Sequence, residues 1–382
     1  MQSLLLRTAA FLLLLSAASA TTIGITYNPS TPNLPPPDHV VSTFQSLHIS
    51  AVRLINPTPA AVRAFAYTNI TLLLSVPNHL IPSFAANRSA AIQWLYSYVL
   101  PYHPRTRISL ISAGSDAITA AATSDPTLDP STVIIPAMRN LHFSLIDLGI
   151  KTISVSTTLS FIDIMTTSFP PSAAEFQEPI GSLIIHPLLQ FLSETNSSFL
   201  INLYPYNVYR INSEIPIGYA LFQEHPFNFR DDVITGVRYR NLFDMMVDAI
   251  VASMAVSGQE NIPVIVTETG WPSESEAQAA GNYAEMYLKG LVRHLRSGLG
   301  TPLRKEGVAE AYIYQLFDEG TNGEANGTTI GAALSGGGGH SWGIMYPNMT
   351  MKYKINFSGA DKRLLKIVLV ILASLVSVLM LL

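Results

Sequence analysis

Short apolar runs recur along the chain, and each is followed by a longer stretch whose apolar residues have helical spacing. The runs are largely continuous rather than alternating, as is typical of parallel strands covered on both faces. The predicted strands are Ile23–Tyr27, Ala51–Ile55, Ile70–Val76, Arg107–Ala113, Lys151–Thr157, Ser198–Tyr204, Pro263–Thr267 and Ala309–Leu316. The main predicted helices are Pro37–Leu47, Ala90–Val99, Pro136–Leu148, Tyr239–Ser257 and Ala277–Arg296.

This alternation of strands and helices predicts an α/β protein with a single (β/α)₈ TIM barrel rather than two domains. Asn87 and Ser89 are both candidate N-caps of the second helix, and Gly149 lies just past the end of the third. Active sites of this fold lie at the carboxyl ends of the strands, so the residues that follow each run are the candidates for chemistry.

The amino-terminal end carries a targeting pattern. Arg7, an apolar run at 9–15 and the small residues 18–20 predict a secretory signal peptide over residues 1–20. A buried first helix is the alternative, and it is disfavoured because the run is short and ends in small residues. The predicted mature chain begins at Thr21, and its barrel domain spans residues 21–357.

An apolar segment from residue 364 to residue 382 closes the chain, with Lys366 as its only charge. Small residues begin at Ser358, so we predict a glycosylphosphatidylinositol (GPI) anchor signal over residues 358–382 with Ser358 as the attachment site. A retained transmembrane helix is the alternative, but it would leave basic residues on the outer side against the usual orientation. The predicted location is therefore the cell surface, at the outer leaflet of the plasma membrane.

Composition excludes several kinds of site. The 382 residues include no cysteine, which excludes a disulfide scaffold, a cysteine-ligated zinc site and a thiol nucleophile. The net charge of −4 offers no basic surface to nucleic acid, and no heptad pattern indicates a protein partner. The nine histidines lack metal-ligand spacing, so we predict no metal and no cofactor. Candidate glycosylation sites are the Asn-x-Ser/Thr sequons at Asn69, Asn87, Asn196, Asn326, Asn348 and Asn356.

Acidic and aromatic residues stand where the predicted strands end. Glu268 and Trp271 follow the seventh run, Tyr204 ends the sixth, and Tyr27 ends the first. A carboxylate can attack an anomeric carbon, and aromatic rings can stack on sugars. From these residues alone, a structural salt bridge at Glu268 and ordinary packing of the tyrosines are equally good interpretations.

Short motifs follow one another in a fixed order over nearly the whole mature chain. They are VPN at 76–78, IIPAMRN at 134–140, VSTT at 155–158, NLYPY at 202–206, YALF at 219–222, NLFDMMVDA at 241–249, TETGWPS at 267–273, AYIYQLFDE at 311–319 and WGIMYPN at 342–348. Together they resemble the family 17 glycoside hydrolases of plants, which are endo-1,3-β-glucanases. Many plant members also have an export signal and a GPI signal.

The resemblance implies a retaining mechanism with one glutamate as nucleophile and another as general acid/base. Glu268 lies in the intact TETGWPS motif and is the implied nucleophile. Tyr27 and Tyr204 match aromatic residues that face the sugar subsites, and Trp271 is a further candidate for holding a sugar ring. Glu319 matches a glutamate that supports the acid/base region.

The end of the fourth strand departs from the family pattern. Where the family reads V-G-N-E, with the glutamate as acid/base, this chain reads Ala113-Gly114-Ser115-Asp116. Asp116 keeps a carboxylate on a shorter arm, and Ser115 replaces an amide that can hydrogen-bond to the sugar. Retaining catalysis needs carboxyl groups about 5–5.5 Å apart, and a misplacement of about 1 Å can cost about 100-fold.

Asp116 therefore has three interpretations. It is a weakened acid/base that still works, or it is a remnant in a barrel that binds glucan without cutting it. In the third, another acid has taken over the role, and the candidates are Asp163, Glu175, Glu178 and Asp318.

Two functions follow from these interpretations. The first is hydrolysis of internal 1,3-β-glucosidic bonds of cell-wall glucan by retaining double displacement, with Glu268 as nucleophile and Asp116 as acid/base. The alternative is a catalytically impaired, GPI-anchored protein that binds 1,3-β-glucan. The predicted partners are this polysaccharide and, through the anchor, the membrane. Arg304 and Lys305 are predicted to be a solvated basic pair rather than a sugar contact.

Overall fold

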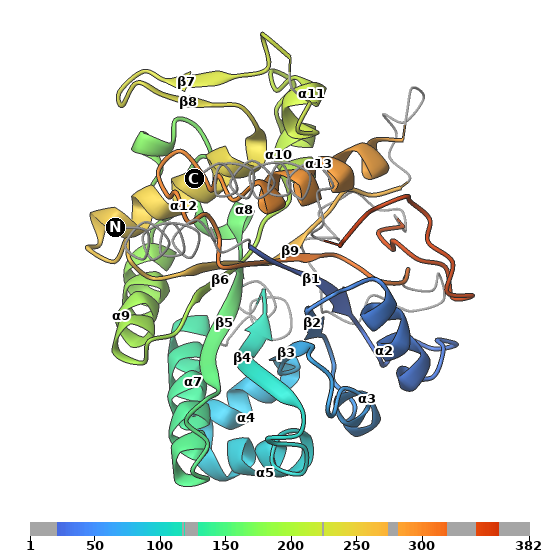
Figure 1. The fold of residues 1–382 in the computed structure, drawn as a ribbon. Coiled ribbons are helices and arrows are strands. Elements are labelled where there is room, and N and C mark those ends of the chain that lie inside the picture. The colour runs from blue at the N-terminus through green and yellow to red at the C-terminus, as the bar shows by residue number, and fades with distance from the viewer. Residues whose placement is uncertain are drawn as a thin grey trace, which may run out of the picture.

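All eight predicted strands are confirmed as the strands of one closed parallel barrel (Figure 1). The computed structural model describes residues 21–116, 118, 129–223, 225–273, 282–318 and 341–358. The barrel strands are β1 (Thr22–Tyr27), β2 (Ala51–Leu54), β3 (Thr71–Ser75), β4 (Arg107–Ser115), β5 (Ser154–Ser160), β6 (Phe199–Asn202), β9 (Val264–Thr269) and β10 (Glu310–Ile313). Their order around the barrel is β1-β10-β9-β6-β5-β4-β3-β2.

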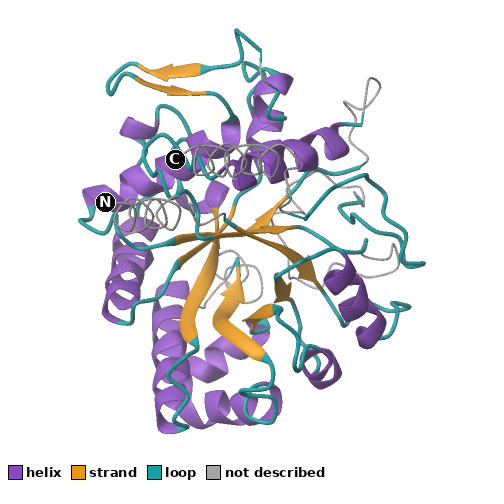
Figure 2. Cartoon of the chain, viewed as in Figure 1, coloured by secondary structure: helices purple, strands orange, loops and turns teal. Residues whose placement is uncertain are grey.

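The predicted helices also form, and they lie outside the strands (Figure 2). They are α2 (Pro37–Ser46), α5 (Arg88–Tyr98), α7 (Pro130–Asp147), α12 (Leu242–Val256) and α13 (Tyr283–Ser297). Asn87 is the N-cap of α5, since its side chain accepts a hydrogen bond from the Ser89 backbone N–H at 2.9 Å. Further helices that the sequence did not predict are α3 (Pro59–Ala64), α4 (Ile81–Ala86), α8 (Phe161–Ile164), α9 (His186–Glu194), α10 (Pro205–Ile211) and α11 (Ile217–Ala220).

An antiparallel hairpin, formed by β7 (Arg230–Asp232) and β8 (Val237–Tyr239), lies apart from the barrel strands (Figure 1). Barrel strand β6 therefore pairs directly with β9. The helix predicted from Tyr239 begins only at Leu242, because Tyr239 belongs to the hairpin. Asn241 is the N-cap of that helix and accepts from the Asp244 backbone N–H at 2.8 Å.

The amino-terminal part of the barrel interior is apolar. Its side chains form a small buried cluster of Ala51, Leu73, Leu110, Leu200, Ile265 and Tyr312. Gly24 completes this layer because a Cβ there would lie 2.4 Å from the Tyr312 ring. Side chains in a strand alternate between faces, so the residue two positions later on each strand also points inward.

That next layer of inward-pointing side chains is polar, and it supplies residues of the candidate active site. Its members are Thr26, Arg53, Ser75, Ser112, Thr158, Asn202, Thr267 and Tyr314. Buried polar groups are stable only when they are hydrogen-bonded, so this layer requires a connected network at the carboxyl end of the barrel.

The carboxyl-terminal described segment, residues 341–358, packs back onto the barrel domain. Phe357 is 2% exposed and is the last buried residue of the described chain. The predicted signal peptide and most of the predicted anchor signal lie outside the described residues. Within the described ranges, no helix is both long enough and apolar enough to cross a bilayer.

Candidate active site

Glu268 lies near the end of β9, completely buried and held by two strong donors. The Arg53 guanidinium on β2 forms an ion pair with Glu268 Oε1. The Tyr204 hydroxyl donates to Glu268 Oε2 at 2.6 Å. A buried carboxylate needs such partners, and Arg53 and Tyr204 together bind both oxygens of Glu268.

The Arg53 guanidinium also links Glu268 to the end of β4. Its Nη2 donates to Ser115 Oγ at 2.8 Å, and its Nε donates to Ser75 Oγ at 3.1 Å. Asn78 holds the Ser115 backbone from the other side, accepting from its N–H and donating to its carbonyl, both at 2.8 Å. Ser115 is thus fixed beside the guanidinium that pairs with Glu268.

Asp116 follows directly, is 2% exposed and has a left-handed backbone with φ of +47°. Its Oδ1 accepts from Asn202 Nδ2 at 2.9 Å, while its buried Oδ2 has no hydrogen-bond partner in the described part of the chain. Burial raises the pKa of Asp116 to about 8, and the nearby negative charge of Glu268 contributes to the rise. Asp116 is therefore a neutral acid at mildly acidic pH.

Aromatic rings extend from Glu268 across the barrel end. The Trp342 ring centroid lies 5.2 Å from that of Tyr204 and 5.8 Å from that of Tyr206. Trp271 lies 5.1 Å from Tyr206, and its buried Nε1 has no hydrogen-bond partner among the described residues. The sequence-predicted Tyr204 and Trp271 therefore belong to one aromatic cluster, of a kind that can stack on sugar rings.

Two further residues expected at the site are Tyr27 and Glu319. Tyr27, at the end of β1, packs edge-to-face against Phe44 and Phe317 with centroids 6.3 and 6.2 Å away. Burial raises the pKa of its hydroxyl to about 12. Glu319 lies outside the described residues.

The four acids considered as replacements for Asp116 differ in burial and in their contacts. Glu175 and Glu178 are exposed. Asp318 accepts from the Gly343 N–H at 2.7 Å and pairs with Lys352, so it holds the carboxyl-terminal segment. Asp163 is half-buried, and its charge contributes to the raised pKa of Asp116.

Sequence reasoning missed Arg53, Asn202 and Trp342. Arg53 is completely buried, and the available signal was an arginine inside an otherwise apolar strand, where a charge needs a partner. Asn202 and Trp342 stand inside quoted motifs, but their contacts come from distant elements. In the described ranges, no three His, Asp or Glu side chains gather as metal ligands.

The predicted glycosylation sites are exposed wherever the structure describes them. These asparagines are Asn69, Asn87, Asn196, Asn348 and Asn356, while Asn326 lies outside the described residues. The predicted anchor residue Ser358 is half-buried and directly follows Phe357.

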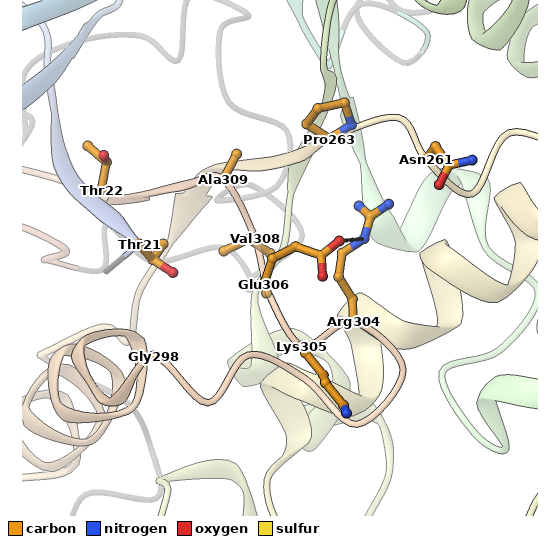
Figure 3. A pocket seen from close by; sticks show the side chains of 11 residues that line it. Thr21, Thr22, Asn261, Pro263, Gly298, Arg304, Lys305, Glu306, Val308 and Ala309 are labelled. Atoms are coloured by element: carbon orange, nitrogen blue, oxygen red, sulfur yellow. Dashed lines mark ion pairs between the residues drawn. The ribbon is translucent and has the colours of Figure 1, made fainter. Parts of the chain in front are cut away.

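A cavity of about 540 Å³ lies at the opposite end of the barrel, near the starts of β1, β9 and β10 (Figure 3). Arg304 lines it, pairs with Glu306 at 3.4 Å and donates to the Ile262 carbonyl oxygen at 2.9 Å. Arg304 is only 7% exposed, so the prediction of a solvated pair was wrong for Arg304 and correct for the exposed Lys305. This cavity is remote from the carboxylates at the strand ends.

Known proteins resemble the chain in both sequence and structure. The sequence model of glycosyl hydrolases family 17 matches residues 23–357. Glucan endo-1,3-beta-glucosidase 13 of Arabidopsis thaliana is 34% identical over 358 residues, which cover 91% of this chain and 66% of that protein. Glucan endo-1,3-beta-glucosidase 12 of the same plant is 35% identical, over 91% of this chain and 62% of its own length. The chain therefore spans about two thirds or less of these relatives.

Among solved structures, CJP38, described as a beta-1,3-glucanase and allergen of Cryptomeria japonica pollen, superposes with a TM-score of 0.78. It is 31% identical, and the match covers 88% of this chain and 99% of CJP38. A structure described as one of two plant beta-glucan endohydrolases with distinct substrate specificities has a TM-score of 0.74 and 33% identity. That match covers 87% of this chain and 100% of the other.

Proposed function

The chain belongs to glycosyl hydrolase family 17, and from this premise we propose that it hydrolyses internal 1,3-β-glucosidic bonds of β-glucan with retention of configuration. Glu268 is the proposed nucleophile and Asp116 the proposed acid/base. The relatives named above as 1,3-β-glucosidases and a 1,3-β-glucanase support the choice of substrate.

The single observation that carries the proposal is the unequal environment of the two carboxyl groups. Glu268 has a partner on each carboxyl oxygen, the Arg53 guanidinium on one and the Tyr204 hydroxyl on the other. Asp116 accepts one hydrogen bond, from Asn202, and its burial raises its pKa to about 8. A pair of acids whose environments differ in this way divides into a nucleophile and a proton donor.

The reaction then proceeds in two steps. In the first, a Glu268 oxygen bonds to the anomeric carbon while the glycosidic bond breaks, and the Asp116 proton passes to the leaving oxygen. In the second, ionised Asp116 takes a proton from water, whose oxygen displaces Glu268 from the sugar. The aromatic cluster of Tyr204, Trp342, Tyr206 and Trp271 is the proposed support for the sugar rings.

The proposal is tested by reducing-sugar release from linear 1,3-β-glucan, with a 1,4-β-glucan as the substrate control. Glu268→Gln should lower turnover by about 10³-fold or more, since the covalent intermediate cannot form. Glu310→Gln is the matched control, because Glu310 is a half-buried glutamate near the start of β10, at the other end of the barrel. Turnover that survives in Glu268→Gln within about tenfold would contradict the proposed nucleophile.

The alternative function is glucan binding with little or no turnover. The observation that favours it is Asp116 itself, whose arm is shorter than the family's glutamate by about one bond, roughly 1.5 Å, at a site where about 1 Å can cost about 100-fold. Binding of 1,3-β-glucan by a parent protein that releases no reducing sugar would select this alternative.

We also propose that the protein acts at the cell surface, held by a GPI anchor at Ser358 and facing the cell wall. The signal patterns at both ends support this location, as does the exposure of the described sequons. Phosphatidylinositol-specific phospholipase C should release the protein from intact membranes. Protein that this enzyme leaves in place but detergent extracts would favour a retained transmembrane helix.

A further inference from the structure

We propose that Asn202 is a positioning residue that determines which oxygen of Asp116 carries the reacting proton, and that Thr267 sets the orientation of the Asn202 amide. The inference rests on the proposed function, since it concerns how the acid/base of that reaction is held. Neither residue was among the site residues expected from the sequence.

A chain of two hydrogen bonds carries the inference. Thr267 Oγ1 donates to Asn202 Oδ1 at 2.9 Å, and Asn202 Nδ2 donates to Asp116 Oδ1 at 2.9 Å. All three side chains are buried, with exposures of 0–2%. Within the polar layer of the barrel, these bonds connect β9 to β6 and β6 to the end of β4.

The orientation of the Asn202 amide matters because an amide has one accepting end and one donating end. The Thr267 hydroxyl satisfies the accepting end, which leaves the donating end facing Asp116. The reverse orientation would set the Asn202 carbonyl oxygen against Asp116 Oδ1, which is unfavourable whenever Asp116 is ionised. The observed orientation serves both protonation states that an acid/base must pass through.

The consequence for Asp116 is a choice between its two oxygens. Oδ1 is occupied as an acceptor, so the proton of the neutral acid resides on Oδ2. Oδ2 is the buried atom that lacks a hydrogen-bond partner among the described residues. The same oxygen would give its proton to the leaving group and later take one from water.

The other charged and titratable groups around Asp116 come from different elements. Glu268 on β9 and Asp163 on α8 raise the pKa of Asp116, and Arg53 on β2 lowers it. Tyr204, after β6, interacts electrostatically with Asp116 and hydrogen-bonds to Glu268. The hydrogen bond from Asn202 lowers the pKa of Asp116, because it stabilises the charged form.

The test compares Asn202→Leu and Thr267→Val in the intact, purified protein. Thr157→Val is the matched control, since Thr157 is a buried barrel threonine whose Oγ1 donates to the Ala113 carbonyl oxygen at 2.8 Å. Three quantities are measured: kcat and KM on a 1,3-β-glucan oligosaccharide, the basic limb of the pH profile, and the ¹³C chemical shift of the Asp116 carboxyl group during titration.

In Asn202→Leu we expect the basic limb and the Asp116 titration to move upward by about one pH unit. We also expect kcat to fall by about tenfold or more with KM nearly unchanged, because the proton is no longer directed. Thr267→Val should act in the same direction with a smaller effect, and Thr157→Val should move none of these quantities. Asn202→Leu and Thr267→Val that behave like Thr157→Val would overturn the proposal.

Failure of the proposed function has a different signature. A parent protein without turnover would contradict hydrolysis, but the ¹³C titration needs no turnover and still tests the hydrogen bond. An Asp116 titration that is identical in the parent and in folded Asn202→Leu would then overturn the positioning role. Thr267→Val, which changes only a hydroxyl to a methyl group, provides the same test if Asn202→Leu does not fold.

Discussion

Replacement of Asp116 by asparagine removes the proposed acid/base while preserving the size of the side chain. The backbone of Asp116 is left-handed, a conformation that asparagine adopts more readily than most residues, so the turn after β4 should persist. The substitution therefore affects the chemistry of the carboxyl group more than the fold.

The expected magnitude follows from the pKa of Asp116. With its ordinary value of 3.8, about 1 aspartate in 160 would be protonated at pH 6, whereas a pKa of about 8 keeps about 99% in the acid form. The parent should therefore retain kcat/KM up to about pH 8 and lose it above. General acid catalysis contributes about 10²–10⁴-fold, so Asp116→Asn should lose about that factor on glucan.

Two substrates make the assay specific to proton transfer. A 1,3-β-glucan oligosaccharide has a poor leaving group, whereas an activated aryl glycoside leaves without protonation. On the aryl glycoside, Asp116→Asn should show a nearly normal burst followed by slow turnover, because the base for water is missing. Azide, which needs no base, should restore turnover and yield the β-glycosyl azide.

An Asp116→Asn variant that keeps the parent rate on glucan within about threefold would refute Asp116 as the general acid. A basic limb that stays near pH 8 in Asp116→Asn would refute this role equally, since another group would then be the acid.

Three further predictions concern the surroundings of the site and the stability of the barrel. Asp163→Asn should move the basic limb of kcat/KM to lower pH, because the charge of Asp163 raises the pKa of Asp116; an unchanged limb would argue against this coupling. Arg53→Met should lower the free energy of unfolding in denaturant by about 3–5 kcal/mol, because Glu268 is left buried without its ion pair. Adding Glu268→Gln should recover part of that loss, and no recovery would show that Arg53 acts mainly by packing. Burial raises the pKa of Asp248 to about 7, so the folded state holds this proton more tightly than the unfolded state, in which the pKa is 3.8. Stability of the parent should therefore fall as pH rises from about 4 to about 7, relative to Asp248→Asn, and parallel thermal-unfolding curves for the two proteins would contradict this.

The sequence by itself determined the barrel and the rim on which the site lies. Continuous apolar runs such as Ala51–Ile55 identify strands covered on both faces, and their number and alternation with helices specify the fold. Asn87 could be named as a helix cap because capping is a local interaction. Glu268 could be placed at a strand end because it directly follows the apolar run Pro263–Thr267, which is also a local pattern.

Only the tertiary structure decided what surrounds each carboxyl group. Arg53 and Glu268 are 215 positions apart in the chain, and Asn202 and Asp116 are 86 apart, yet barrel closure makes each pair a direct contact. The interior layer that contains Arg53 and Asn202 is fixed by the register between neighbouring strands, which no single segment encodes. The raised pKa of Asp116 likewise depends on its burial and on charges from other elements, so the different environments of the two carboxyl groups arise only in the folded barrel.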